Sequence, residues 1–127
     1  MSVDLITSPD APPAVGPYSH ASTHNGVLYC SGCIPLDAEG TFIGGDAANQ
    51  AKQALSNLAS VLAAGGAAKT DVLKTVVFLT DMADFASVNA VYAEFFGDHK
   101  PARSCVAVAQ LPLGVSVEVE AIAAIQG

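Results

Sequence analysis

The sequence has 127 residues, a formal net charge of −7 and a pI near 4.5. That length suits one domain spanning residues 1–127, and the acidic balance argues against binding to nucleic acid or an anionic membrane, which attract cationic proteins. We expect no transmembrane helix, because Pro, Gly and polar residues interrupt every apolar stretch before about 18 residues. The N-terminal segment carries Asp4 and lacks a basic n-region, so a soluble, cytoplasmic protein is expected rather than a secreted one.

The charged fraction is unusually low. Charged residues make up 13% of the chain, whereas about 25% is typical of soluble proteins. So few charges would cover the surface of a small domain poorly. We therefore expect part of the surface to be buried by further copies of the chain, in a closed homo-oligomer.

The N-terminal part predicts two paired strands. Residues 8–17 are rich in Pro and lead into Gly16-Pro17-Tyr18, which indicates an extended segment with turns. Asn25-Gly26 is typical of a two-residue hairpin, and it separates strands predicted at 18–23 and 27–31. A loop is predicted at 37–45.

Two helices and three further strands follow. Asp46 is the predicted N-cap of a helix that ends at Gly65-Gly66, with an apolar stripe of Ala51, Leu55, Leu58 and Leu62. Residues 72–80 predict a buried strand. Asp84 is the predicted cap of the second helix, which ends at Gly97 and has a stripe of Phe85, Val88, Tyr92 and Phe95.

Strands at 101–109 and 115–125 complete the order β-β-α-β-α-β-β. This order predicts an α+β fold in which both helices cover one face of a mixed sheet. The other face would then need a cover, which again favours an oligomer.

Three cysteines and three histidines give weaker signals. Cys30-x-x-Cys33 could suggest zinc or redox chemistry, but zinc needs two further ligands and a redox pair usually opens a helix. Because the pair follows an apolar strand, structural thiols are the favoured interpretation. The scattered histidines, His20, His24 and His99, are interpreted as hydrogen-bonding or surface residues rather than metal ligands.

Arg103 is the only arginine, and it lies in an apolar strand. If that strand formed a hairpin with the last one, one register would place Arg103 opposite Glu120 and Cys105 opposite Glu118, on one face. A shift by one residue would separate the charges across the sheet. Two interpretations stay open: a partly buried salt bridge with a glutamate, within the chain or across a subunit interface, or a guanidinium that binds a ligand carboxylate while a glutamate moves protons or orients water.

Asn89 is less informative than Arg103. It lies at the edge of the apolar stripe of the second helix. A hydrogen bond to the backbone is the favoured interpretation, and a place in a site is the alternative.

Residues 101–123, PARSCVAVAQLPLGVSVEVEAIA, resemble the signature of the Rid (RidA/YjgF) family of reactive-intermediate imine deaminases, also described as L-PSP endoribonuclease-like. The resemblance extends over essentially the whole chain. It includes APPAVGPYSHA, LYCSGCIPLD and LKTVVFLTDMADFASVNAVYAEFF.

The resemblance implies a chorismate-mutase-like homotrimer with three clefts between neighbouring subunits. Family members hydrolyse 2-enamine and 2-imine acids, such as 2-aminoacrylate, 2-iminopropanoate and 2-iminobutanoate, to a 2-keto acid and ammonia, without metal or cofactor. By resemblance, Arg103 would bind the substrate carboxylate and Glu118 would transfer protons or position water. The other residues that would line the cleft are Tyr18, Ser31, Asn89 and Cys105.

The chain departs from the family pattern at three positions. Cys33 stands where many members carry Gln, and Ala107 and Gln110 replace polar or charged residues, so the cleft rim and substrate preference are expected to differ. The alternatives to a deaminase are a non-catalytic trimer that binds small carboxylates or has a regulatory role, and then a ribonuclease or redox-activated chaperone. The acidic charge weighs against the ribonuclease.

Overall fold

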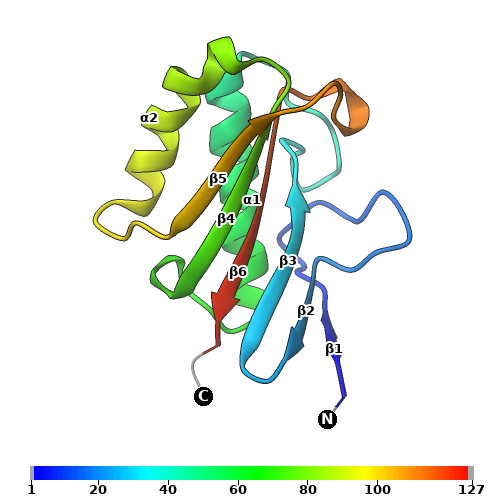
Figure 1. Cartoon of the computed structure of the whole chain (residues 1–127). Coiled ribbons are helices and arrows are strands. Elements are labelled where there is room, and N and C mark those ends of the chain that lie inside the picture. The colour runs from blue at the N-terminus through cyan, green and yellow to red at the C-terminus, as the bar shows by residue number, and fades with distance from the viewer. Residues whose placement is uncertain (1, 126–127) are drawn as a thin grey trace.

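Residues 2–125, the part of the chain that the structure describes, form one six-stranded mixed sheet with two α-helices on one of its faces (Figure 1). This computed structural model confirms the α+β class. In chain order the elements are β1 (Asp4–Ile6), β2 (Ala21–His24), β3 (Val27–Cys33), α1 (Ala47–Ala64), β4 (Val72–Leu79), α2 (Phe85–Phe96), β5 (Ala102–Ala107) and β6 (Val117–Ala124). Short 3-10 turns occupy Lys69–Asp71, Met82–Asp84 and Pro112–Gly114.

The strands lie in the order β1-β2-β3-β6-β4-β5. All neighbours are antiparallel except β4 and β5, which run parallel with α2 as the crossover between them. The hairpin of β5 and β6 that was considered for Arg103 does not form, because β4 separates these strands. β5 is an edge strand, and it pairs only with β4 among the described strands.

Most predicted elements are present with shorter bounds, and one strand was missed. β1 is three residues long and largely exposed, and it pairs with β2 through Leu5 and Ser22. β2 starts at Ala21 rather than at residue 18, because the chain turns at Gly16, whose carbonyl accepts a hydrogen bond from the Tyr18 N–H at 2.9 Å. The hairpin at Asn25-Gly26 is confirmed, with both residues at positive φ.

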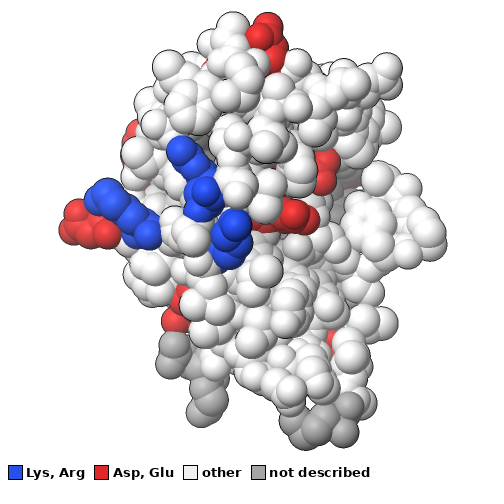
Figure 2. Space-filling model, in the orientation of Figure 1, with Lys and Arg blue, Asp and Glu red and all other residues white. Residues whose placement is uncertain are grey.

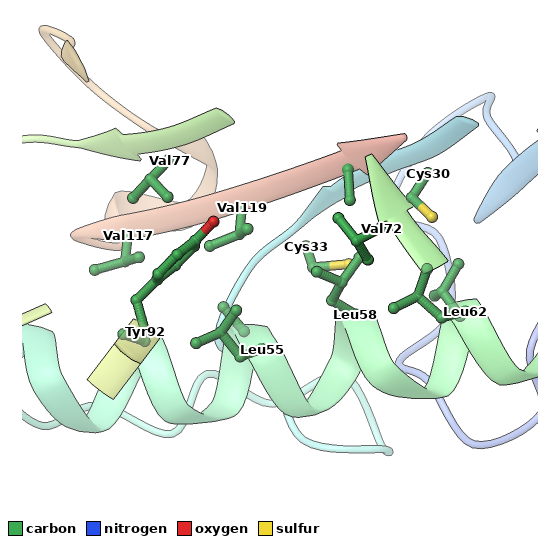
Figure 3. Packing of buried hydrophobic residues seen from close by; sticks show 14 of the residues in the cluster. Cys30, Cys33, Leu55, Leu58, Leu62, Val72, Val77, Tyr92, Val117 and Val119 are labelled. Carbon is green, nitrogen blue, oxygen red and sulfur yellow. The ribbon is translucent and has the colours of Figure 1, made fainter. Parts of the chain in front are cut away.

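The core lies between α1 and the helix-facing side of the sheet (Figure 3). Asp46 caps α1 as predicted, because its carboxylate accepts a hydrogen bond from the Asn49 N–H at 2.9 Å. The predicted stripe of α1 is buried, and it packs on alternate residues of the central strands. These are Val77 and Leu79 of β4 and Val117, Val119, Ala121 and Ala123 of β6.

α2 starts directly after Asp84, its N-cap, and ends before Gly97, as predicted. Asp81, not Asp84, makes the capping hydrogen bond, which it accepts from the Ala83 N–H at the 3-10 turn before the helix. The Asp84 side chain makes no cap hydrogen bond. Phe96 rather than Phe95 is fully buried, although Phe95 still packs at the edge of the core. No helix within residues 2–125 is long and apolar enough to cross a membrane.

Neither α-helix of residues 2–125 covers the other sheet face, and Figure 2 shows blue basic side chains gathered near the middle of this side, next to red acidic ones and surrounded mostly by uncharged atoms. The alternation of the strands places Glu118, Glu120 and Ile122 there, beside Val76 and Phe78 of β4. Tyr29 and Val106 also lie on this face, and they are 48% and 44% exposed. The structure thus leaves this sheet face open in the single chain, and its burial by further copies of the chain stays a prediction.

Candidate functional site

The guanidinium of Arg103 is held by one face of α2. Its Nη1 donates a hydrogen bond to Asn89 Oδ1 at 2.6 Å. Its central carbon lies 4.8 Å from the ring centroid of Tyr92 and 5.7 Å from that of Phe85. Residues 85, 89 and 92 are spaced by four and three positions, so they form one stripe along the helix. We call Arg103 and these three side chains the arginine cluster.

The arginine cluster contains no carboxylate. Within residues 2–125 Arg103 makes no ion pair, so the predicted alternative of a salt bridge with Glu118 or Glu120 in the same chain is wrong. The favoured interpretation of Asn89 is wrong as well, because its amide oxygen accepts from the Arg103 side chain and not from the backbone. A half-buried guanidinium that is supported by a neutral amide and two rings keeps its charge available for an outside anion.

A second group of residues, separate from the arginine cluster, lines a cavity of about 300 Å³. The lining residues are Val15, Tyr18, Ser31, Gly32, Ile34, Pro112 and Glu118, which we call the glutamate pocket. Three of the predicted site residues, Tyr18, Ser31 and Glu118, therefore lie together. Burial raises the pKa of the Glu118 carboxyl above its ordinary value, and the carboxylate of Glu120 raises it further.

Gly32 lets the Glu118 side chain lie against β3. A Cβ at this position would overlap the carboxyl group of Glu118. Gly32 also lies where the β3–β6 register shifts between Cys30 and Cys33. Such irregularities redirect side chains at functional sites. Gly32 was not among the predicted site residues, although a glycine inside a strand pattern indicates close approach of another group.

Hydrogen bonds tie the wall of the glutamate pocket to the N-terminal segment. The Ser31 hydroxyl donates to the Ser19 carbonyl at 2.7 Å, and the Tyr18 hydroxyl accepts from the Val15 N–H at 3.4 Å. His20 accepts from the Ser8 N–H at Nδ1, at 2.9 Å, and its Nε2 lies 2.8 Å from the Pro12 carbonyl. The hydrogen-bonding role predicted for His20 is thus confirmed, and its effect is to tie Ser8 and Pro12 to the start of β2.

The two groups do not meet in one chain. Arg103 pairs in register with Thr75, which lies on the helix-covered face, whereas Glu118 pairs with Phe78 on the open face. Cys105 lies beside Arg103 on the same face of β5, not opposite Glu118 as the hairpin would have placed it. Burial raises the pKa of the Cys105 thiol, an effect that the charge of Arg103 opposes.

The remaining cysteines are held in the core as thiols. Cys30 and Cys33 are buried and unbonded to each other, and burial raises the pKa of each to about 12. A thiol with such a pKa is a poor nucleophile and a poor metal ligand at neutral pH. Residues 2–125 contain no group of three His, Cys, Asp or Glu side chains placed to hold a metal ion. These observations support the interpretation of structural thiols.

Comparisons with known proteins agree with the resemblance seen in the sequence. Residues 8–125 match the family model described as Endoribonuclease L-PSP. The 2-iminobutanoate/2-iminopropanoate deaminase of Salmonella typhimurium is 43% identical over 121 residues, which are 93% of this chain and 94% of that protein.

Solved structures give the same result. A Yersinia pestis protein, YyfA, described as a protein of unknown function of the conserved Rid family, superposes with a TM-score of 0.94 at 40% identity and covers 98% of this chain and 100% of its own. Escherichia coli TdcF, solved with bound serine, has a TM-score of 0.92 at 39% identity and covers 97% of this chain and 99% of its own.

Proposed function

Because this chain belongs to the Endoribonuclease L-PSP family, which includes the Rid proteins, we propose that it is a hydrolytic deaminase of 2-imino and 2-enamino acids. The products are a 2-keto acid and ammonia. The proposed substrates are 2-aminoacrylate, its tautomer 2-iminopropanoate, and 2-iminobutanoate. The name of the Salmonella relative and the serine bound by TdcF support a small amino-acid-like ligand.

The observation that carries this proposal is the state of Arg103. The chain has 12 acidic side chains and one arginine, yet Arg103 has no carboxylate partner within residues 2–125. A guanidinium binds a carboxylate through two parallel N–H···O hydrogen bonds. The carboxylate of a 2-imino acid is the anion that this cation would hold.

Glu118 supplies the second function. In its ionised form it accepts a proton from a water molecule as that water attacks the C=N carbon, and the imine nitrogen takes up a proton. Protonated Glu118 then returns its proton to the amine nitrogen of the carbinolamine, the C–N bond breaks as the hydroxyl group loses its proton to form the C=O bond, and ammonia and the keto acid leave. An iminium carbon is strongly electrophilic, so the reaction needs no covalent nucleophile, metal or cofactor, and orientation of the two reactants provides the catalysis.

We also propose that the copies form a homotrimer whose sites lie between subunits. Arg103 lies on the helix-covered side of an edge strand, whereas Glu118 lies on the open, apolar face. A second copy packed on the open face brings its own β5 edge to the glutamate pocket, and thereby completes a site that one chain lacks. In this arrangement Tyr18 and Ser31 line the glutamate side of the cleft, and Asn89 and Cys105 the arginine side.

The test is a coupled assay in which a pyridoxal-phosphate threonine dehydratase releases 2-iminobutanoate in situ. Wild type should accelerate release of 2-oxobutanoate, and Arg103→Ala and Glu118→Gln should each lose at least about 100-fold, the scale of a lost acid–base or positioning group. Arg103→Ala should still elute as a trimer. If wild-type trimer binds 2-oxobutanoate without accelerating hydrolysis, the protein is a carboxylate-binding protein and not a deaminase.

A further inference from the structure

The Tyr92 ring, which packs against the Arg103 guanidinium, is itself held in place by a hydrogen bond to the sheet. Tyr92 is 8% exposed, and its hydroxyl lies 2.6 Å from the hydroxyl of Thr75, which is completely buried. Figure 3 shows the Tyr92 side chain reaching from the helix layer to the sheet, with its hydroxyl at the sheet end. This buried polar pair stands in a region otherwise made of aliphatic and aromatic side chains.

Thr75 and Arg103 are also neighbours in the sheet. They are paired in register across β4 and β5, on the same face. The contacts therefore form a closed circuit, from the Arg103 backbone across the strand pair to Thr75, through the hydroxyl pair to Tyr92, and from the ring back to the guanidinium. Since each link is short and buried or half-buried, the position of the ring is tied to the strand that carries the arginine.

We propose that Tyr92, anchored by Thr75, is a positioning residue that sets the orientation of the Arg103 guanidinium for its ligand. This inference rests on the proposed function, because it takes the carboxylate of a 2-imino or 2-keto acid as that ligand. The Tyr92 ring supports the guanidinium, and Asn89 fixes its rotation through Nη1. The nitrogen atoms that Asn89 leaves free are then presented in one orientation.

Orientation matters because an arginine side chain has many rotamers, and bidentate binding uses only a few of them. Ordering a long side chain at the moment of binding costs free energy, which a preformed support avoids. A cation over an aromatic ring is attracted by the electrons of the ring face, most strongly where water is excluded. The hydrogen bond between the Tyr92 and Thr75 hydroxyls, which a phenylalanine at residue 92 would lack, fixes the position of the Tyr92 ring.

The competing explanation is that Tyr92 and Thr75 only fill the core. Both explanations predict lower stability on mutation, but only positioning predicts weaker ligand binding by a protein that is still folded. Phe96 offers a matched control. It is 7% exposed, lies on the same helix and contacts the Tyr92 ring at 4.8 Å between centroids, and it has no contact with Arg103.

The experiment measures the dissociation constant of 2-oxobutanoate by calorimetry for the intact oligomer. Tyr92→Leu should weaken binding about 3- to 30-fold, the range that a partly desolvated cation–π contact represents. Thr75→Val and Tyr92→Phe should each weaken it about 2- to 5-fold, since the ring stays but loses its anchor. Thr75→Ser, which keeps the hydroxyl, should restore wild-type affinity, and Phe96→Leu should leave affinity within 2-fold of wild type while lowering the melting temperature.

The possible results distinguish a failure of the Tyr92 positioning role from a failure of the proposed carboxylate site. If wild type binds 2-oxobutanoate and the Tyr92 and Thr75 variants bind it equally well, the positioning role is wrong and the carboxylate site stands. An equal loss in Phe96→Leu would also overturn it, because general loosening of the core would explain the data. If wild type does not bind 2-oxobutanoate at all, the carboxylate site itself is wrong and the inference falls with it. Should Tyr92→Leu fail to fold, the Tyr92→Phe and Thr75→Val variants decide the question.

Discussion

Arg103 and Glu118 point to opposite faces of the same sheet, on strands that β4 separates. Neighbouring strands are about 4.8 Å apart, so two strand spacings and the thickness of the sheet lie between the two side chains. Both residues belong to the motifs that identify the family, yet a single chain keeps them from acting on one small molecule. The inter-subunit site that we propose would bring the two side chains together without any change in the fold.

A mixing experiment tests the inter-subunit site. We expect Arg103→Ala and Glu118→Gln to be inactive alone, and a co-refolded equimolar mixture to regain about a quarter of wild-type activity. A cleft is complete when its arginine comes from a Glu118→Gln copy and its glutamate from an Arg103→Ala copy, which random assembly gives in about one cleft of four.

The control for this experiment is each variant refolded alone through the same procedure. A mixture that regains nothing, although mass spectrometry shows mixed oligomers, would mean that both residues act within one chain. That result would contradict the proposed arrangement of the site between subunits.

Gly32 gives a second prediction. An alanine methyl at residue 32 would overlap the Glu118 carboxyl group, so we expect Gly32→Ala to displace that side chain and lower kcat in the coupled assay at least about 10-fold. Gly16→Ala is the matched control, because its Cβ would meet only the Tyr18 ring, at an ordinary 3.6 Å. Unchanged kcat in Gly32→Ala would show that the position of Glu118 against β3 does not matter.

The sequence predicted the elements well where a local signal exists. Asn25-Gly26 located the hairpin, Asp46 located the start of α1, and the four-and-three spacing of apolar residues located both helices. The cap hydrogen bond at the start of the second helix was predicted less well. Asp84 directly precedes α2, but Asp81 makes the capping hydrogen bond because a 3-10 turn comes first.

Strand order was the larger error, and it has a physical cause. Two successive strands joined by a short connection suggest a hairpin, so a hairpin of β5 and β6 was considered from the sequence. However, β4, α2 and β5 form a strand–helix–strand unit, and such crossovers place their strands parallel and side by side. Once β5 pairs with β4, Arg103 moves to the helix-covered face. Local periodicity does not contain that information, because it is fixed by which strands meet.

The same limit explains the Tyr92–Thr75 pair and the support of Arg103. Tyr92 was predicted as a core residue from helical spacing, which the structure confirms. Its hydrogen bond depends on the packing of α2 over β4, and its contact with Arg103 depends on the position of β5. Both are tertiary relationships between residues far apart in sequence, so the spacing alone predicts neither.

The Glu118 carboxyl makes a prediction about stability and pH. Burial and the nearby Glu120 raise its pKa in the folded protein above the unfolded value. Its contribution to stability is therefore fully present below the unfolded pKa and is lost as the pH rises through the folded pKa. Glu118→Gln, which carries no charge at any pH, should have a higher free energy of unfolding than wild type at pH 7.5.

The measurement is urea unfolding of both proteins at one fixed chain concentration, at pH 4 and pH 7.5. We expect the advantage of Glu118→Gln to shrink at pH 4, where most of the wild-type Glu118 side chains are protonated in both states. Glu120→Gln should stabilise the ionised form of Glu118, which lowers the folded pKa and so narrows the pH range over which Glu118 affects stability. A Glu118→Gln variant that is less stable than wild type at pH 7.5 would show that the carboxylate has a favourable partner in the assembled protein.

The buried thiols give the last prediction. Burial raises the pKa of Cys30 and Cys33 to about 12, so the thiolate is almost absent at pH 8, and both side chains are closed to reagents. We expect iodoacetamide to leave both unmodified in the native protein and to modify both within minutes in urea, as followed by peptide mass spectrometry. Cys105 is half-buried beside Arg103 and serves as the internal reference, with slow native labelling. Rapid native labelling of Cys30 or Cys33, or a disulfide between them after mild oxidation, would make this pair a redox site, because only a thiol that reaches solvent can react on that timescale.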